Sequence, residues 1–220
     1  MAKVKYSKIR THQRYKLGDG SVATGVTTAL NIISKPALMH WAWKCGCDGI
    51  DYRKTRDQAA DIGSLAHWMC ECHLKGVEPD MSEFSPADTS KAENAFLKFL
   101  DWWQKGKYTL TASEIQLVSE IYRYGGTLDI VARDADDRLC LCDIKTSKAV
   151  YEEMWYQVAA YQRLWDEHHP YDMISSVSIV RIGKQAEDGD FEVQTRKDLA
   201  KHFTVFKAAL HLYQAMKNLK

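Results

Sequence analysis

The chain has 220 residues, of which 45% are hydrophobic and 27% are charged, and its formal net charge at pH 7 is +1. This composition is typical of a globular protein with one well-buried domain, and so small a net charge does not by itself indicate a nucleic-acid binder. No apolar run approaches the roughly 20 residues of a membrane span, and the opening residues lack the apolar core of a secretory signal. We therefore expect an intracellular, cytoplasmic protein without a membrane partner.

Basic residues gather at the two ends of the chain. The first 18 residues carry six basic side chains and no acid, and the last 25 carry six against Asp198 alone. Phosphate-binding surfaces need a local excess of charge, because salt screens exposed charges beyond about 10 Å. These ends suit DNA binding, although basic ends also act as solubilising tails. We expect one domain over residues 1–220, with a basic lead-in over 1–20, a core at about 55–182 and a C-terminal helix over about 198–220.

Helical spacing and turn signals organise the first half of the chain. Pro36 falls in the first turn of an expected helix that continues through Trp41. Apolar residues at helical spacing predict a long helix from Asp51 to Leu74. We expect a loop from Gly76 to Ser90 and, capped by the last three residues of that loop, a helix from Lys91 to about Lys105.

Period-two alternation predicts strands in the second half of the chain. The expected strands are Thr109–Tyr124, Gly126–Arg133, Arg138–Lys145, Ile174–Ile182 and, more weakly, Phe191–Thr195. Helices are expected from Tyr151 to Trp165 and from Asp198 to Lys220. These elements predict an α/β fold in which a mixed central sheet is flanked by helices.

The polar residues 134–137 have the composition of a tight turn and would join two of these strands in a hairpin. In an antiparallel ladder centred on this turn, opposed positions sum to about 272. Asp129 would then lie opposite Asp143. Alternation places both acids and Lys145 on one face of the sheet, and Leu128 on the other.

Two carboxylates that face each other across a sheet repel, so Asp129 and Asp143 favour a bound cation. Hard oxygen ligands suit Mg²⁺ or Mn²⁺. Lys145 would lie beside the same ion, where it could orient or deprotonate an attacking water, or neutralise charge that develops on a phosphate. For these residues alone, an ordinary hairpin with solvated or salt-bridged acids is the alternative.

Several short motifs follow one another along the chain. They are Gly63-x-x-x-His67, Gly126-Thr-Leu-Asp129, Asp143-Ile-Lys145, Gln157-x-x-x-Tyr161 and, more loosely, Thr27-Thr28 with Pro36 to Trp41. In this order they resemble the PD-(D/E)XK nuclease superfamily, specifically its RecB-like exonuclease branch, which includes phage-type exonucleases. The resemblance covers residues 24–165 and implies a restriction-endonuclease-like core.

The resemblance implies a metal site and names its ligands. They are His67, Glu114, Asp129, Asp143 and the backbone carbonyl of Ile144. For the acid of the first core strand, Glu120 is the alternative to Glu114, and either could be a surface carboxylate. Without the resemblance, His67 would more often be a core or cap residue.

The resemblance also implies a catalytic and DNA-holding set. Its members are Asp129, Asp143, Lys145, Gln157 and Tyr161. Lys145 would act on the water, and Gln157 and Tyr161, four residues apart on one helix face, would help to hold the DNA. Tyr161 also belongs to an apolar stripe with Met154 and Val158, so core packing is its alternative role.

Six cysteines occur as three Cys-x-Cys pairs, and we expect them to be reduced thiols. Some members of the branch hold an iron–sulfur cluster with one cysteine before the histidine motif and three after the Gln-x-x-x-Tyr helix. No cysteine follows Cys142, so we expect no such cluster. A zinc site is a lesser alternative, because paired zinc ligands are more often separated by about two to four residues.

Together these features predict a divalent-metal-dependent DNA exonuclease that hydrolyses phosphodiester bonds in recombination or repair. Its expected partners are DNA and recombination or replication proteins, and a phage-encoded protein would act in the host cytoplasm. Two alternatives stay open. They are a site-specific or structure-specific endonuclease on the same core, and a non-catalytic DNA-binding module. Cleavage polarity, strand preference and oligomeric state do not follow from the sequence.

Overall fold

The computed structural model describes residues 3–6, 14–185 and 190–219, so the predicted roles of Lys8, Arg10 and Lys220 as basic end residues lie outside it. Helices and strands are interspersed along the chain. Their order is β1 (Lys3–Lys5), β2 (Thr24–Gly25), α1 (Val26–Leu30), α2 (Pro36–Cys47), α3 (Tyr52–Leu74), β3 (Glu78–Asp80), α4 (Pro86–Lys105), β4 (Thr109–Ser119), β5 (Tyr124–Arg133), β6 (Leu139–Lys145), α5 (Glu152–His168), β7 (Ser176–Ile182), β8 (Phe191–Arg196) and α6 (Ala200–Asn218). Within the described ranges, no helix combines the length and the apolar run that a bilayer crossing requires.

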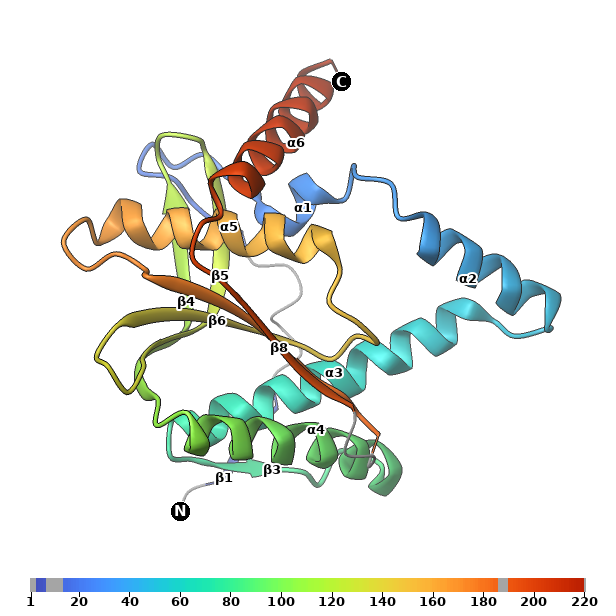
Figure 1. Cartoon of the computed structure of the whole chain (residues 1–220). Helices are drawn as coiled ribbons and strands as arrows, with labels where there is room; N and C mark the ends of the chain where they lie inside the picture. Colours follow the sequence, from blue (N-terminus) through green and yellow to red (C-terminus); the bar gives the residue numbers. More distant parts are fainter. Residues whose placement is uncertain (1–2, 7–13, 186–189, 220) are drawn as a thin grey trace.

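Six strands form the central sheet, in the order β2-β5-β6-β7-β8 with β4 beside β5. The pairs β2–β5 and β6–β7 are parallel, and the pairs β4–β5, β5–β6 and β7–β8 are antiparallel. Helices cover both faces of this sheet (Figure 1). The predicted mixed sheet flanked by helices is therefore confirmed.

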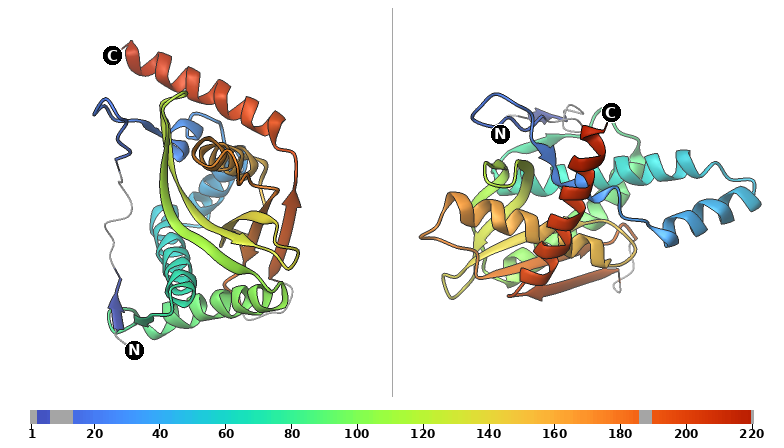
Figure 2. Two further views of the ribbon diagram at one scale, coloured as in Figure 1. Left: turned by 90° about the vertical axis from the view of Figure 1, so that its left-hand side faces the viewer. Right: turned by 90° about the horizontal axis from the view of Figure 1, so that it is seen from above.

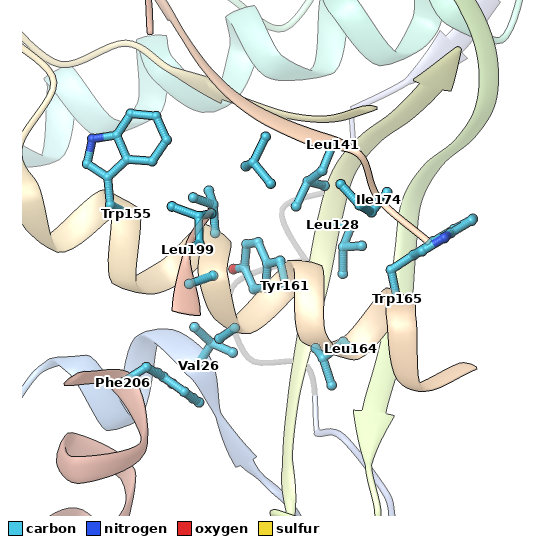
Figure 3. Close-up of a cluster of buried hydrophobic side chains, with 14 of the residues drawn as sticks. Val26, Leu128, Leu141, Trp155, Tyr161, Leu164, Trp165, Ile174, Leu199 and Phe206 are labelled. Atoms are coloured by element: carbon cyan, nitrogen blue, oxygen red, sulfur yellow. The ribbon is translucent and has the colours of Figure 1, made fainter. Parts of the chain in front are cut away.

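Two apolar clusters fix the layers of the molecule. On one face, α1, α5 and α6 pack against the sheet through a cluster that includes Trp155, Tyr161 and Phe206, all at most 5% exposed (Figure 3). On the other face, α3 and α4 pack through a cluster that includes Leu65 and Phe99. Figure 2 shows the two helical layers on either side of the strands. Burying a large apolar side chain stabilises a fold by about 1.5–3 kcal/mol, so these clusters hold the sheet between the helices.

The structure corrects two predicted boundaries. Helix α4 begins at Pro86 rather than at Lys91, because the Ser85 hydroxyl accepts a hydrogen bond from the Asp88 N–H at 3.1 Å and caps it. The predicted strand over 109–124 ends at Ser119, where a turn leads into β5.

The first segment of the chain also forms a strand that the sequence did not indicate. Strand β1 pairs in parallel with β3, inside the segment predicted to be a loop, and the two make a separate two-stranded sheet. Directly after β1, the Tyr6 ring packs edge-on against Trp68 of α3, so this described part of the basic lead-in lies against that helix.

The predicted register of the hairpin is confirmed over four pairs, which run from Ile130 opposite Cys142 to Arg133 opposite Leu139. The ladder stops there, one position short of Asp129 and Asp143. The predicted face of Leu128 is wrong. Leu128 lies in the apolar cluster of α5, whereas Ile130 lies in the cluster of α3. Strand β5 therefore changes face between these two residues.

Strand β4 is distorted at the same level. Ala112 and Ile115 both pack against the cluster of α5, although residues three apart on a regular strand point to opposite faces. Between them Glu114 has a φ of 52°, in the left-handed region that non-glycine residues seldom adopt. The pairs on either side, Ser113 with Ile130 and Ile115 with Leu128, set Glu114 opposite Asp129. Both strands thus re-aim their side chains at one position.

Asp134 organises the turn of the hairpin. Its Oδ1 accepts hydrogen bonds from the N–H groups of Asp136 (2.9 Å) and Arg138 (3.0 Å), and its Oδ2 accepts one from the Arg138 Nε (2.9 Å). Burial alone would raise the pKa of Asp134, but these hydrogen bonds outweigh it and the pKa is lowered. The ionised carboxylate therefore stabilises the turn.

We expect Asp134→Asn to lower the free energy of unfolding by about 1 kcal/mol near neutral pH, because it weakens charge-assisted hydrogen bonds. The difference from wild type should persist above pH 3.8, the ordinary pKa of the group. It should disappear as the pH falls through the lowered pKa of the folded state, where wild type also loses the charge. Urea unfolding followed by circular dichroism at several pH values measures both quantities.

Asp136→Asn is the matched control. The Asp136 carboxylate is 69% exposed and pairs only with the Arg138 guanidinium, so its loss should change stability little. An equal effect of the two substitutions, or an Asp134→Asn effect that persists at the lowest pH, would contradict this account of the turn.

Candidate active site

The site is built around an edge of β5 that two strands share. Strand β2 pairs with this edge at residues 124–125, and β6 pairs with it at residues 130–133. Between them, residues 126–129 face no strand of the described chain on that edge. The Asp129 Oδ2 accepts a hydrogen bond from the Ile144 N–H at 2.9 Å. The Asp129 carboxylate thus takes the place of a backbone acceptor where the pairing of β5 with β6 stops.

Helix α3 brings His67 to the same point. The Nδ1 atom of His67 lies 3.6 Å from the Asp129 Oδ2. Four residues earlier, a Cβ atom on Gly63 would lie 2.5 Å from the Thr146 hydroxyl oxygen. Glycine is therefore needed for α3 to approach the segment that follows β6, and that approach places His67 beside Asp129.

Lys145 and Asp143 form an ion pair, with 2.5 Å between Nζ and Oδ2. The Asp143 side chain is 1% exposed, and its Oδ1 has no hydrogen-bond partner among the described residues. Burial raises the pKa of Asp143 to about 6, Lys145 opposes the rise, and Asp129 adds to it. A buried carboxylate in this setting favours a cation at close range.

The pKa values of the two basic groups, His67 and Lys145, shift in opposite directions. Burial and the nearby Lys145 lower the pKa of His67 to about 4, so its imidazole is neutral at physiological pH. Burial alone would lower the pKa of Lys145 as well, but Asp143 and Asp129 outweigh it and the pKa is raised. Lys145 is therefore held as an ammonium, which donates hydrogen bonds.

Glu114 and not Glu120 lies in the site. A cavity of about 920 Å³ is lined by Glu114 and Asp129 together with His67, Lys145 and Gln157. A second cavity of about 660 Å³ shares Glu114 and Asp129 with it. The carboxylate of Glu120 instead accepts a hydrogen bond from the Gly18 N–H at 2.8 Å, in an exposed turn.

Gln157 and Tyr161 are joined on α5, because the Gln157 Nε2 donates a hydrogen bond to the Tyr161 hydroxyl at 2.8 Å. The Tyr161 ring lies in the apolar cluster (Figure 3). A Cβ atom on Gly126 would approach it to 2.5 Å, so the glycine of the Gly-x-x-Asp motif makes room for this ring. Tyr161 lines the 660 Å³ cavity, and Gln157 lines the 920 Å³ cavity. The core packing considered for Tyr161 is therefore observed, and the residue also reaches a cavity of the candidate site.

The metal ligands predicted from the sequence do not form a closed cluster. Within the described parts of the chain, no group of three His, Cys, Asp or Glu side chains is arranged to hold a metal ion. Glu114, Asp129, Ile144 and His67 line the larger cavity, whereas Asp143 lines neither cavity and is held by Lys145. The six cysteines are free thiols, and all except Cys47 are buried.

Two residues near the site had no signal in the sequence. The Tyr15 hydroxyl lies 3.0 Å from the Thr127 hydroxyl and lines the smaller cavity. Lys184, at the end of β7, lines the larger one. Both come from segments far from the motifs, so only the folded arrangement identifies them.

No protein-family model and no curated protein matches the chain. Two solved structures share part of its arrangement. The SSO0001 protein has 16% identity over 70% of this chain and 85% of its own, with a TM-score of 0.38. A protein from Eubacterium rectale described as a "putative exonuclease" has 11% identity over 70% of this chain and 64% of its own, with a TM-score of 0.43.

The close approach of Gly63 to Thr146 gives a test of how the site is assembled. We expect Gly63→Ala to cost about 1–3 kcal/mol in the free energy of unfolding, because the new methyl group meets the Thr146 hydroxyl. Thr146→Ala removes that oxygen. The double variant should therefore recover most of the stability, and the helix should also gain from alanine.

A double-mutant cycle measured by urea unfolding quantifies this coupling. Thr146→Ala alone serves as the control, with a small effect expected. Additive effects of the two substitutions would show that α3 does not depend on this close approach.

Proposed function

We propose that the protein is a divalent-metal-dependent deoxyribonuclease that hydrolyses phosphodiester bonds at the ends of DNA. The observation that carries the proposal is the convergence of Asp129, Glu114, His67 and Lys145 on one cavity at the opening between β2 and β6. Carboxylates and an ammonium at one point suit a reaction in which charge on a phosphate is stabilised from two sides. The motifs shared with RecB-like exonucleases support DNA as the substrate and favour exonuclease action.

The residues present suit a hard divalent cation such as Mg²⁺ or Mn²⁺. Oxygen donors predominate, and the Oδ1 of the buried Asp143 has no hydrogen-bond partner among the described residues. The residues that would hold the cation are Asp129, Asp143, Glu114, His67 and the carbonyl of Ile144. When bound, the cation would lower the pKa of water and stabilise charge on the phosphate. Asp143 would then exchange its Lys145 partner for the cation.

The protein's own groups would position the substrate and the water. Asp129 is held by the Ile144 N–H and lines the cavity, where its carboxylate would act as an acceptor. Lys145, as an ammonium, would orient the water or donate to a phosphate oxygen. Gln157, held by Tyr161, presents an amide at the cavity wall for contact with the DNA. The proposed biological setting is DNA recombination or repair. In that setting the partners of this protein would be recombination or replication proteins.

The decisive experiment incubates purified protein with end-labelled linear DNA and with circular DNA, in the presence of Mg²⁺, Mn²⁺ or a chelator. We expect metal-dependent loss of linear DNA from its ends, and a loss of at least about 100-fold in rate for Lys145→Ala, because a group that stabilises transition-state charge is removed. The label pattern gives the polarity.

Each other outcome assigns a different function. Cleavage of circular DNA would reject the exonuclease in favour of an endonuclease on the same core. DNA binding without cleavage under any metal would favour a non-catalytic DNA-binding module.

Glu114 and Glu120 provide a matched pair on neighbouring parts of the chain. We expect Glu114→Gln to reduce the cleavage rate by about 100-fold or more and to raise the metal concentration needed for half-maximal rate, because a carboxylate of the cavity is lost. Glu120→Gln should leave both quantities unchanged, since this carboxylate only accepts a hydrogen bond in an exposed turn. Titration of rate against Mg²⁺ measures both effects. Equal activity of the two variants would remove Glu114 from the proposed site.

A further inference from the structure

Another cavity, which is rich in basic side chains, adjoins the candidate active site. Its volume is about 720 Å³, and its lining comes from α3, α4, the segment after β6 and the end of β7. It shares four residues with the 920 Å³ cavity. These are Ala59, Thr146, Ser147 and Lys184. The two cavities therefore adjoin at Thr146 and Ser147, the residues that follow Lys145 in the chain.

The charges that line the two cavities differ in sign. Three carboxylates and two lysines line the 920 Å³ cavity, whereas four basic side chains and one carboxylate line the 720 Å³ basic cavity. The four basic side chains are Lys91, Lys148, Arg181 and Lys184, and the carboxylate is Asp190. An acidic space that suits cations thus opens into a basic space that suits anions.

Arg181 is already held in ion pairs with two carboxylates. Its Nη1 lies 2.6 Å from the Asp190 Oδ1, its Nε lies 3.3 Å from the Glu192 Oε2, and its side chain is 8% exposed. In contrast, Lys91, Lys148 and Lys184 form no ion pair with any carboxylate of the described residues. Three lysines of the basic cavity therefore keep their charge available for a ligand.

Lys184 is the best placed of the three, because it lines both cavities. Its Nζ donates a hydrogen bond to the Ala59 carbonyl at 2.8 Å, which ties the end of β7 to α3. An ammonium has three N–H donors, so two remain for a ligand. Burial lowers the pKa of Lys184, and an anion in contact with it would offset that cost.

We propose that this basic cavity is a phosphate subsite, in which Lys184, Lys148 and Lys91 hold a DNA phosphate that neighbours the one hydrolysed beside Lys145. The identity of the ligand rests on the proposed nuclease function, whereas the preference for an anion rests on the lining charges. The phosphate can belong to the end of the strand or to its backbone, because the recognising chemistry is the same. In either case the subsite fixes the position of the strand relative to Asp129 and Lys145.

The test measures binding without cleavage. Labelled short single strands and the matching duplexes are titrated with the whole protein in chelator, at several salt concentrations, and binding is followed by fluorescence anisotropy. We expect Lys184→Met to weaken binding several-fold. For this variant the slope of log K against log salt should become less steep. The change should be about 0.7 for single strands or about 0.9 for duplexes for each phosphate that the variant no longer neutralises. Lys148→Met and Lys91→Met should act in the same direction.

Lys105→Met is the matched control, because the Lys105 side chain is 76% exposed and lines none of the cavities described above. It should change neither the affinity nor the slope. If all three cavity variants bind DNA as wild type does, or if Lys105→Met weakens binding as much as they do, the subsite is rejected. Methionine keeps the apolar stem of lysine, and unchanged thermal unfolding confirms that each variant is folded.

Oligonucleotides with a 5′-phosphate, a 3′-phosphate or neither distinguish the two sources of the phosphate. An effect confined to one phosphorylated end assigns the subsite to that end, whereas equal effects on all three assign it to the backbone. The inference and the proposed function fail separately. Lysine-dependent binding by a protein that never cuts DNA would reject the nuclease alone. Cleavage and binding that ignore the three lysines would reject the subsite alone.

Discussion

The candidate site depends on one strand that pairs with three others. Strand β5 pairs with β4 along one edge, and shares its other edge between β2 and β6. Two strands cannot occupy the same stretch of an edge, so backbone groups are left there that need another partner. The Asp129 carboxylate supplies that partner to Ile144, and the left-handed backbone of Glu114 re-aims the opposing strand. The acids of the cavity are therefore a product of sheet topology and not of a local motif alone.

Burial then determines what these groups can do. Asp143 lies so deep that its charge requires a cation, and Lys145 provides one from two residues away on the same strand. His67 is kept neutral by the same burial and by the same lysine. Helix α3 can reach this place because Gly63 has no side chain toward Thr146. The charge state of each group thus follows from the packing of α3 on the end of β6.

Local patterns predicted more of this structure than long-range patterns did. The register of the hairpin could be predicted because the turn at Asp134 fixes the centre of the ladder. The face of Leu128 could not, because it depends on a distortion shared with β4. The start of α4 was misplaced because Ser85 outcompetes later capping candidates. Lys184 gave no signal at all, since the cavity that it lines is assembled from four separate segments.

The ion pair of Lys145 with Asp143 has a consequence for how the protein matures in a cell. A buried acid that carries its own tethered counterion lets the chain reach its folded state without a metal ion, so folding and the proposed metal binding would be separate events. A cation that bound there would have to displace an ammonium held at high effective concentration. In a metal-dependent enzyme built this way, the fraction of molecules with metal bound follows the free metal concentration of the compartment. At low metal concentration the protein stays folded but inactive.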